Sequence, residues 1–558
     1  MVGMHAPLVI VGLDGGTLDL VGPWVADGTL PHLAGLLACG AWGRLRSTVP
    51  AATFPAWTSL VTGVNPGRHG VLDFTERVPG TYRVRFVNGS RRRAAALWSR
   101  FTAAGLRSTV LTVPGTYPPE PVHGVMVSGW DSPLTTAVDG SFVFPRAFYD
   151  EMTAVVGRVP FADFQEVDTS AGWHERALER LLAGVTRRTA LARYCLERER
   201  PDLFMVVFGE SDTVAHHFWR FHDPRSPRYA PSAFADALRQ VYQALDTAIG
   251  EIVAAAPREA TVAIVSDHGS GGASDWVVHL NRRLAERGLL GFALGAPRWA
   301  RWARDLALAA VPFAWQGPLL RRLPNASGAL ESQVRFGGID WPATRAYSEE
   351  LDYHPSVWIN LAGREPGGMV SPADYRAVRE EVVAALESWC HDDGSPVVAR
   401  VWRREEILHG PATDRAPDLL LELALRQGYS PSCLRSQGPG PSLRRLVGPE
   451  HGAGKGSGMN GAHRRDGMLV LAGNGVRPIG DLGACDIVDV VPTLLAAAGL
   501  PIPDGLDGVA CARALDRVPC IEPDHVPPPG GGHLYYDAQA EAEIATRLSA
   551  LGYLEAAR

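Results

Sequence analysis

Cysteine is scarce in this sequence, and no two cysteines form a close pair along the chain. The 558 residues include seven cysteines, an odd number with no C-x-x-C motif. They are Cys39, Cys195, Cys390, Cys433, Cys485, Cys511 and Cys520. This pattern excludes a disulfide framework and a zinc ribbon, and it is typical of reduced, structural thiols in the cytosol.

Long apolar runs and a targeting segment are also missing. No stretch approaches the roughly 20 apolar residues that a membrane-spanning helix needs. The segment Met1–Pro7 has no positive region, no long apolar stretch and no cleavage site, unlike a secretory signal. We therefore expect a cytoplasmic protein without a transmembrane segment.

Charge of one sign is not in excess either. The net charge is −6, which is small for a chain of this length. The one basic block is Arg91–Arg93, and we expect it to lie on a solvated surface. A protein that coats nucleic acid is excluded, and no nucleic-acid binding is expected.

Short apolar runs alternate with helical patterns along most of the chain. This alternation is typical of an α/β fold with a mainly parallel central sheet. The predicted strands are Leu8–Leu13, Ser108–Val113, Gly124–Ser128, Asp202–Phe208, Ala260–Ser266, Asp418–Leu423 and Gly467–Ala472. The predicted helices are Pro31–Ala38, His174–Arg198, Ser232–Ala256, Pro372–Cys390 and Val488–Ala498, the last ended by Gly499.

Changes in composition divide the chain into parts. Residues 1–290 form the first part of the core, 291–344 an inserted cap or lid, 345–521 the second part, and 522–558 a linker and terminal helix. Within the cap, Trp299–Trp315 predicts an amphipathic lid or oligomer helix, with membrane-surface binding as the weaker alternative. Residues 426–461 predict a long loop, 523–532 a linker, and 537–551 the final helix.

Acidic residues and histidines follow several of the predicted strands. Asp267 and His268 come directly after one buried strand, and Asp14 ends another, followed by two glycines. Asp212 and His216 are four residues apart, so one helical turn places them on the same face. A further histidine, His463, precedes a strand. Each residue alone is typical of a structural role, but strand ends of one sheet can bring all of them to a single metal site.

Thr53 stands at the start of a predicted short helix that ends at Gly63. Pro55 lies in its first turn, and Thr53 is expected to be the N-cap. A hydroxyl at a helix N-terminus faces backbone N–H groups and the positive end of the helix dipole, which favours phosphate. A plain capping threonine is the alternative, because a threonine hydroxyl needs a base or a metal to act as a nucleophile.

These segments resemble the alkaline phosphatase superfamily. Within it, the chain is similar to type I phosphodiesterases/nucleotide pyrophosphatases, and more closely to a group of predicted phosphohydrolases and phosphomutases. The resemblance covers nearly the whole core and thins at residues 291–344. The matching segments are Val11–Thr17, Thr53–Gly70, Ser211–Trp219, Ser266–Gly269, Tyr347–Pro366, Ala462–Gly467 and Leu548–Leu554.

The resemblance implies an alkaline-phosphatase-like core, with helices on both faces of the sheet, and two metal ions. One ion would be bound by Asp212, His216 and His463. The other would be bound by Asp14, Asp267, His268 and the oxygen of Thr53. Mixed Asp/His ligation favours zinc, with manganese as the alternative. Thr53 would then attack phosphorus and form a phosphothreonine.

The sequence also departs from parts of this superfamily. A sulfatase needs Cys or Ser in a C/S-x-P-x-R motif, whereas this chain has Thr53 and has Trp57 in place of the Arg. The Asn that helps to hold phosphate in nucleotide pyrophosphatases has only Asn65 and Asn88 as candidates. The other candidates for contact with substrate are His217, Arg464, Arg465, His69 and Arg68.

The sequence therefore predicts a two-metal-dependent phosphoester hydrolase of the phosphodiesterase/nucleotide pyrophosphatase or phosphatase type. Its expected partner is a small phosphorylated substrate such as a nucleotide or phosphodiester, and self-association stays open. A phosphomutase acting on a small phosphorylated metabolite is one alternative. A non-catalytic module that binds metal or phosphate is the other, although such a module has no reason to retain all seven ligand positions.

Overall fold

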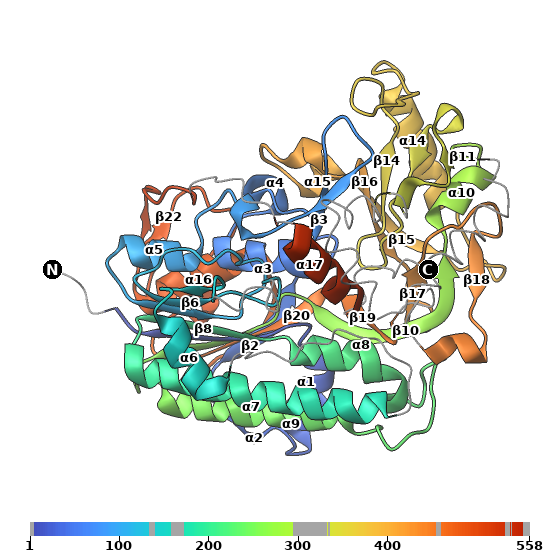
Figure 1. Cartoon of the computed structure of the whole chain (residues 1–558). Coiled ribbons are helices and arrows are strands. Elements are labelled where there is room, and N and C mark those ends of the chain that lie inside the picture. Colours follow the sequence, from blue (N-terminus) through green and yellow to red (C-terminus); the bar gives the residue numbers. More distant parts are fainter. Residues whose placement is uncertain are drawn as a thin grey trace.

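A nine-stranded, mainly parallel sheet forms the centre of the computed structural model (Figure 1). The structure describes residues 5–132, 140–157, 172–293, 332, 335–452, 459–529, 536 and 538–550. In spatial order the strands are β21 (Gly480–Asp486), β2 (Ala41–Arg46), β20 (Asp466–Gly473), β9 (Thr261–Val265), β1 (Leu8–Leu13), β8 (Leu203–Phe208), β5 (Ser108–Leu111), β6 (Gly124–Val127) and β7 (Val143–Phe144). Strands β9, β1, β8, β5 and β6 are mutually parallel, while β20 is antiparallel to both of its neighbours. The predicted α/β class and mainly parallel sheet are confirmed.

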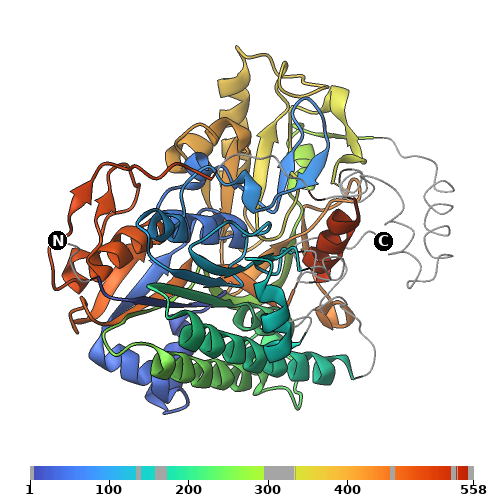
Figure 2. The same ribbon diagram turned by 60° about the vertical axis from the view of Figure 1, so that its left-hand side comes forward.

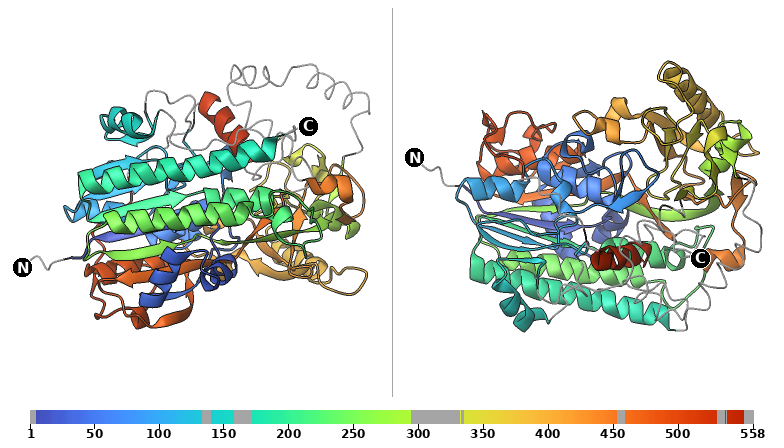
Figure 3. Two further views of the ribbon diagram at one scale, coloured as in Figure 1. Left: turned by 90° about the horizontal axis from the view of Figure 1, so that it is seen from below. Right: turned by 45° about the horizontal axis from the view of Figure 1, so that its top comes forward.

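Helices cover both faces of this sheet, as predicted. On one face, α1 (Leu18–Ala26), α2 (Pro31–Cys39), α6 (Phe148–Val156), α7 (Trp173–Glu199), α8 (Glu210–His222) and α9 (Ala237–Ala255) share an apolar core with Val9 and Val11 of β1. On the other, α3 (Thr53–Thr62), α5 (Leu97–Ala103) and α16 (Val490–Ala498) pack on Leu8 and Ile10. Figure 3 shows α7 and α9 side by side beneath the sheet. Strand β1 is apolar throughout because both of its faces are covered.

The predicted helices agree with the structure except at their ends. Helix α9 begins at Ala237 rather than Ser232, because residues 233–236 form a turn. The segment expected from Val488 is divided into a 3-10 turn, Ile487–Asp489, and α16. Gly499 ends α16 with a left-handed φ of 78°, as predicted. Two further predicted helices are present as α14 (Tyr375–Glu387) and α17 (Ala538–Ala550).

A second, smaller group of sheets lies beside the main one (Figure 2). Its antiparallel sheet consists of β13 (Ala346–Tyr347), β14 (Ser356–Ile359), β16 (Leu419–Leu423) and β15 (Val398–Arg403), and it shares an apolar core with α14 and α10 (Leu280–Glu286). A further sheet is built around β10 (Gly269–Val278), which pairs with β17 (Ser430–Cys433), β18 (Leu443–Arg445) and β19 (Gly461–Arg464). The predicted strand at Asp418 is therefore real, but it lies outside the central sheet.

Two predictions from the sequence are wrong, one for residues 426–461 and one for Arg91–Arg93. Residues 426–461 are not one long loop, since they contain β17 and β18. Their partner β10 begins with small residues and has little apolar alternation, so the sequence does not mark it as a strand. The block Arg91–Arg93 is not a solvated face either. Arg91 and Arg92 are buried and form ion pairs with Glu76 of β3 (Thr75–Arg77) and with Glu120, and only Arg93 is exposed.

Some predicted segments lie outside the described residues. These are Trp299–Trp315, most of the 291–344 insertion, and the end of the chain beyond residue 550. The described edges of the insertion pair as two short strands, β11 (Gly291–Phe292) and β12 (Ile339–Asp340). None of the helices in the described ranges combines the length and the apolar character needed to cross a membrane.

Candidate active site and metal centre

The candidate site lies at the carboxyl ends of three adjacent parallel strands. Asp14 directly follows β1, and Asp267 and His268 come just after β9. Helix α8 begins at Glu210, two residues after β8 ends, and carries Asp212 and His216. Because β1 pairs with both β8 and β9 in parallel, these three ends meet at one edge of the sheet. This is the placement that the sequence predicts.

One group of three ligand side chains comes from α8 and β19. The Oδ1 atom of Asp212 lies 3.2 Å from Nε2 of His216 and 3.6 Å from Nε2 of His463. The two imidazole Nε2 atoms are 3.1 Å apart. His463 lies within β19, opposite Ser270 of β10, rather than in a loop before a strand. The antiparallel pairing of β19 with β10 thus brings it next to Asp267 and His268.

A second group of three consists of Asp14, Asp267 and His268, all of which are buried. Nε2 of His268 lies 3.5 Å from Oδ1 of Asp14 and 3.4 Å from Oδ2 of Asp267. The Gly15 N–H donates to Oδ1 of Asp267 at 3.3 Å, and the Trp57 indole N–H donates to Oδ2 of Asp14 at 3.4 Å. The rings of His268 and His463 stack with their centroids 3.7 Å apart, which joins the two groups.

Each histidine is oriented by a backbone carbonyl. Nδ1 of His216 lies 3.1 Å from the carbonyl oxygen of Gly461, Nδ1 of His463 lies 2.7 Å from that of Ala51, and Nδ1 of His268 lies 3.0 Å from that of Gly269. A carbonyl only accepts, so each Nδ1 carries the proton. In the neutral ring Nε2 therefore presents a lone pair to the site.

This donor set fits bound cations. Two imidazole Nε2 atoms that lie 3.1 Å apart, together with three carboxylates, are ligand types that bind divalent cations. Oδ1 of Asp14 and Oδ2 of Asp267 are buried and receive no hydrogen bond from the described part of the chain. Burial and the neighbouring Asp267 and Asp212 raise the pKa of Asp14 well above its usual value, and burial raises the pKa of Asp267 to about 6. The two groups therefore match the two metal sites that the motifs imply.

Thr53 stands beside the second group. Its Oγ1 lies 3.4 Å from Nε2 of His268, and its side chain is fully buried. Thr53 is the first residue of α3 rather than its N-cap, because Ala52 has the extended backbone of the capping position. The hydroxyl thus lies at the positive end of the helix dipole, next to the metal ligands. Gly63 ends the helix with a φ of 72°, as predicted.

The sequence matches the family model of type I phosphodiesterase/nucleotide pyrophosphatase over residues 8–437. The chain belongs to this family. The family predicted from the motifs is confirmed, and the central sheet with helices on both faces agrees with the alkaline-phosphatase-like fold.

Curated relatives match this chain over a short segment. Ectonucleotide pyrophosphatase/phosphodiesterase family member 1 of Homo sapiens is 35% identical over 68 residues, as is the protein of the same name from Rattus norvegicus. That segment is 12% of this chain and 7% of each relative, so the match spans a small part of their length.

Solved structures resemble this chain at low sequence identity. Phosphonoacetate hydrolase from Sinorhizobium meliloti 1021, in complex with phosphonoformate, has a TM-score of 0.50 and 16% identity over 88% of this chain and 96% of that one. Human ectonucleotide pyrophosphatase/phosphodiesterase 5 has a TM-score of 0.47 and 12% identity over 92% of this chain and all of the other.

Asn65 and Arg464, two predicted substrate contacts, have partners within the protein. Asn65 is the N-cap of α4 (Pro66–His69) and donates its amide to Asp507 at 2.8 Å. Arg464 follows His463 on β19, and successive strand residues point to opposite faces, so its side chain leaves the site. Its guanidinium binds Ser430 and the carbonyl oxygens of Gly272 and Gly428.

His217 is adjacent to His216 on α8, but adjacent helical residues do not share a face. Its ring packs edge-on against Trp173, with centroids 5.0 Å apart, and burial lowers its pKa to about 3. The remaining candidates also have structural contacts. Asn88 caps the 3-10 turn Gly89–Arg91, Arg68 binds Asp507, His69 bonds to Ser59, and Arg465 lies near Glu422.

Several residues of the site carry no metal-ligand signal in the sequence. The carbonyls of Ala51, Gly269 and Gly461 that orient the histidines belong to backbone, which any residue supplies. Ser211 and Ser270 donate their hydroxyls to the carbonyl oxygens of Asp14 and Gly15, respectively, and so fix the turn after β1. Trp57 could have been found, because it lies four residues after Thr53 and so shares its helix face.

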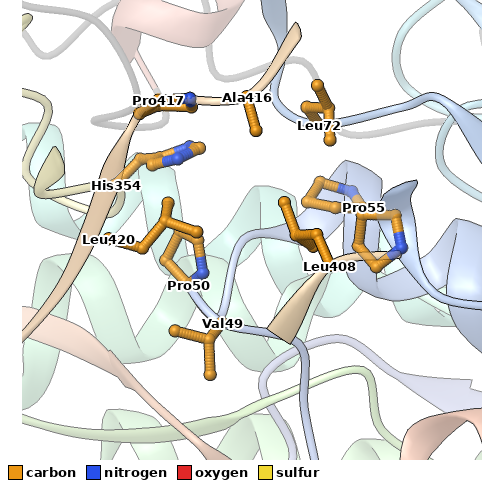
Figure 4. A pocket seen from close by; sticks show the side chains of 10 residues that line it. Val49, Pro50, Pro55, Leu72, His354, Leu408, Ala416, Pro417 and Leu420 are labelled. Atoms are coloured by element: carbon orange, nitrogen blue, oxygen red, sulfur yellow. The ribbon is translucent and has the colours of Figure 1, made fainter. Parts of the chain in front are cut away.

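An apolar pocket lies beside the N-terminus of α3 (Figure 4). Pro50 and Pro55, which flank Thr53 in the sequence, form part of its wall. His354 is the only polar side chain in the lining, and its Nδ1 lies 3.8 Å from Oδ1 of Asp73. The other lining residues are Val49, Pro66, Leu72, Leu408, Ala416, Pro417 and Leu420. Thr53 is not among these lining residues, so the pocket lies next to the candidate site and not within it.

Proposed function

We propose that this protein is a two-metal-dependent phosphoester hydrolase that acts through a phosphothreonine on Thr53. The observation that carries the proposal is the position of Oγ1 of Thr53, 3.4 Å from Nε2 of His268 and at the start of α3. A buried threonine hydroxyl next to six converging ligand side chains is not needed to begin a helix, because Ala52 already occupies the capping position.

The two groups would hold one cation each. Asp212, His216 and His463 supply one set, and Asp14, Asp267 and His268 supply the other, to which the oxygen of Thr53 is added. Two imidazoles and a carboxylate suit zinc, with manganese as the alternative. When bound, the cations supply Lewis acidity that lowers the pKa of a hydroxyl or water and stabilises negative charge on phosphate.

The proposed reaction consists of two successive displacements at phosphorus. In the first, Oγ1 of Thr53 attacks phosphorus, the Thr–O–P bond forms, and the bond to the leaving oxygen breaks. The hydroxyl proton is transferred to that leaving oxygen. In the second, water attacks phosphorus, the Thr–O–P bond breaks and the hydroxyl is restored. The N-terminus of α3 favours the negative charge that the phosphate brings.

The substrate class that fits this proposal is a small phosphoester such as a nucleotide or another phosphodiester. The cytoplasmic location and the absence of a nucleic-acid partner stay predictions from the sequence.

Replacement of the nucleophile tests the proposal. We expect Thr53→Ala to lower turnover of bis-p-nitrophenyl phosphate or p-nitrophenyl phosphate, with added Zn²⁺ or Mn²⁺, by about 10³-fold or more, because no oxygen remains to attack. Fold and metal content should be largely kept, and Thr53→Ser should restore part of the rate. Thr58→Ala is the matched control, since Thr58 lies on the same helix and donates to the carbonyl oxygen of Phe54 at 2.7 Å.

Full activity of Thr53→Ala would exclude the threonine mechanism. Measurement of released inorganic phosphate separates a hydrolase from a phosphomutase, which would return the phosphoryl group to another hydroxyl of the same substrate. Purified protein without two equivalents of bound metal, and without turnover of either ester, would favour the non-catalytic binding module.

A further inference from the structure

Two of the seven cysteines, far apart in the sequence, meet at the edge of the central sheet. Sγ of Cys511 lies 3.0 Å from Sγ of Cys485, although 26 residues separate them. Cys485 is on the edge strand β21, opposite Leu45 of β2, and Cys511 precedes the 3-10 turn Ala512–Ala514. The sequence predicted scattered thiols, because only the fold brings these two together.

The two thiols differ in environment. Cys485 is 8% exposed and belongs to the apolar core on the α3 side of the sheet, whereas Cys511 is only partly buried against that core. The hydrogen bond between them lowers the pKa of Cys511 and raises that of Cys485. Cys511 is therefore the thiol that solvent reaches and that more readily becomes a thiolate.

The segment 505–511, which ends at Cys511, fastens the C-terminus of α3. The backbone N–H groups of Asp507 and Gly508 both donate to the carbonyl oxygen of Gly63, at 3.0 and 3.2 Å. The Asp507 carboxylate accepts from the N–H of Asn65 at 2.7 Å, which holds the start of α4. The same segment therefore supports the helix that begins with Thr53.

Few side chains hold the segment on its other side. The Val509 N–H donates to Oδ1 of Asp489 at 2.8 Å, and the Cys511 N–H donates to Oγ1 of Thr493 at 2.9 Å. The Val509 side chain is 74% exposed. A covalent link at Cys511 would therefore add a further attachment at the end of the segment opposite to the Asp507 contacts.

We propose that Cys485 and Cys511 form a reversible disulfide. This bond attaches segment 505–511 to β21 and stabilises the C-terminal end of α3 at Gly63. The oxidant is a low-molecular-weight disulfide such as oxidised glutathione. The Cys511 thiolate attacks it, forming a mixed disulfide and releasing one thiolate. The Cys485 thiolate then attacks the Cys511 sulfur, the protein disulfide forms and the second thiolate leaves. The two released thiolates take up the two protons that the cysteine thiols lose.

The test uses the full chain with the three exposed cysteines, Cys39, Cys390 and Cys520, replaced by serine. After treatment with oxidised glutathione, we expect two of the four remaining thiols to be lost, with no glutathione added to the mass. Peptide mapping should join Cys485 to Cys511. The melting temperature should rise by about a few degrees over the dithiothreitol-treated protein, because the cross-link restricts the unfolded chain.

Three variants in this background provide the controls. Cys511→Ser and Cys485→Ser should each abolish the link and the rise in melting temperature, whereas Cys195→Ser should keep both. Four free thiols after oxidation, or glutathione retained on Cys511 as the end product, would overturn the proposal. A link without any change in melting temperature would overturn its stabilising role. None of these measurements depends on phosphoester hydrolysis.

Discussion

At the scale of single residues, the candidate metal centre depends on a glycine that leaves room for charged groups. Gly15 has a φ of +65°, in the left-handed region. A Cβ atom there would lie 2.7 Å from Oγ of Ser270 and 3.0 Å from Oδ1 of Asp212. The first distance is shorter than real Cβ atoms show, and the second lies at the lower limit of such distances. The turn after β1 therefore needs glycine for conformation and for space.

We expect Gly15→Ala to lower metal affinity and turnover by about 10-fold or more, because Asp212 must move. Gly28→Ala is the matched control. Gly28 has a φ of +81° but no atom within 4 Å of its added Cβ. Both variants should lose about 1 kcal/mol of stability from the backbone conformation. Isothermal titration with Zn²⁺ and ester hydrolysis measure the difference, and equal effects in the two variants would contradict this view of Gly15.

The ligand residues could be predicted from sequence because strand ends are visible as apolar runs. Asp14, Asp267 and His268 follow such runs, and the parallel order of the strands places them together. The predicted substrate contacts stay predictions. Asn65 and Arg464 are polar residues next to a motif, but local capping and strand alternation direct their side chains to structural partners.

At the scale of elements, helix α8 carries two candidate metal ligands and is held by an ion pair with α7. Glu210, its first residue, pairs with Arg188 of α7, and both side chains are at least nine-tenths buried. Removing one partner of a buried pair leaves an uncompensated charge, whereas an exposed pair contributes little. Helix α7 also offers an exposed comparison, since Arg193 pairs with Glu251 of α9 at 3.0 Å.

We expect Arg188→Leu to lower the free energy of unfolding by about 3 kcal/mol or more, since Glu210 would lie buried without its charged partner. Arg193→Leu should change it by less than about 1 kcal/mol. Urea unfolding followed by circular dichroism measures both. A double variant with Glu210→Leu should recover part of the loss, and a cost for Arg188→Leu no larger than for Arg193→Leu would refute the argument.

One element that the sequence does not predict is β10, which lacks apolar alternation. Strand β10 reads Gly-Ser-Gly-Gly-Ala-Ser before its apolar end, yet it organises β17, β18 and β19. Its glycines are required by close neighbours: at Gly269 a Cβ atom would lie 2.1 Å from the carbonyl oxygen of Asp466. Contacts with other segments of the fold determine that these residues form a strand, and such contacts cannot be read from a single sequence.

At the scale of the whole molecule, the fold buries the three carboxylates of Asp14, Asp212 and Asp267 at one edge of the central sheet. Burial raises the pKa of Asp267 to about 6, and burial with two neighbouring carboxylates raises that of Asp14 well above its usual value. A folded pKa above the unfolded one means that the metal-free folded state binds more protons. Its free energy of unfolding should therefore fall as the pH rises through about 6.

Bound metal should reverse this loss, because cations take the place of those protons. We expect Zn²⁺ or Mn²⁺ to raise the melting temperature of chelator-treated protein by several degrees at pH 8, in line with about 4 kcal/mol at 1,000-fold excess over Kd. The gain should be much smaller at pH 5, where Asp14 and Asp267 keep their protons. Asp267→Asn should make the metal-free protein less sensitive to pH between 5 and 8. Differential scanning fluorimetry measures each case, and equal metal gains at both pH values would show that these carboxylates do not bind the ions.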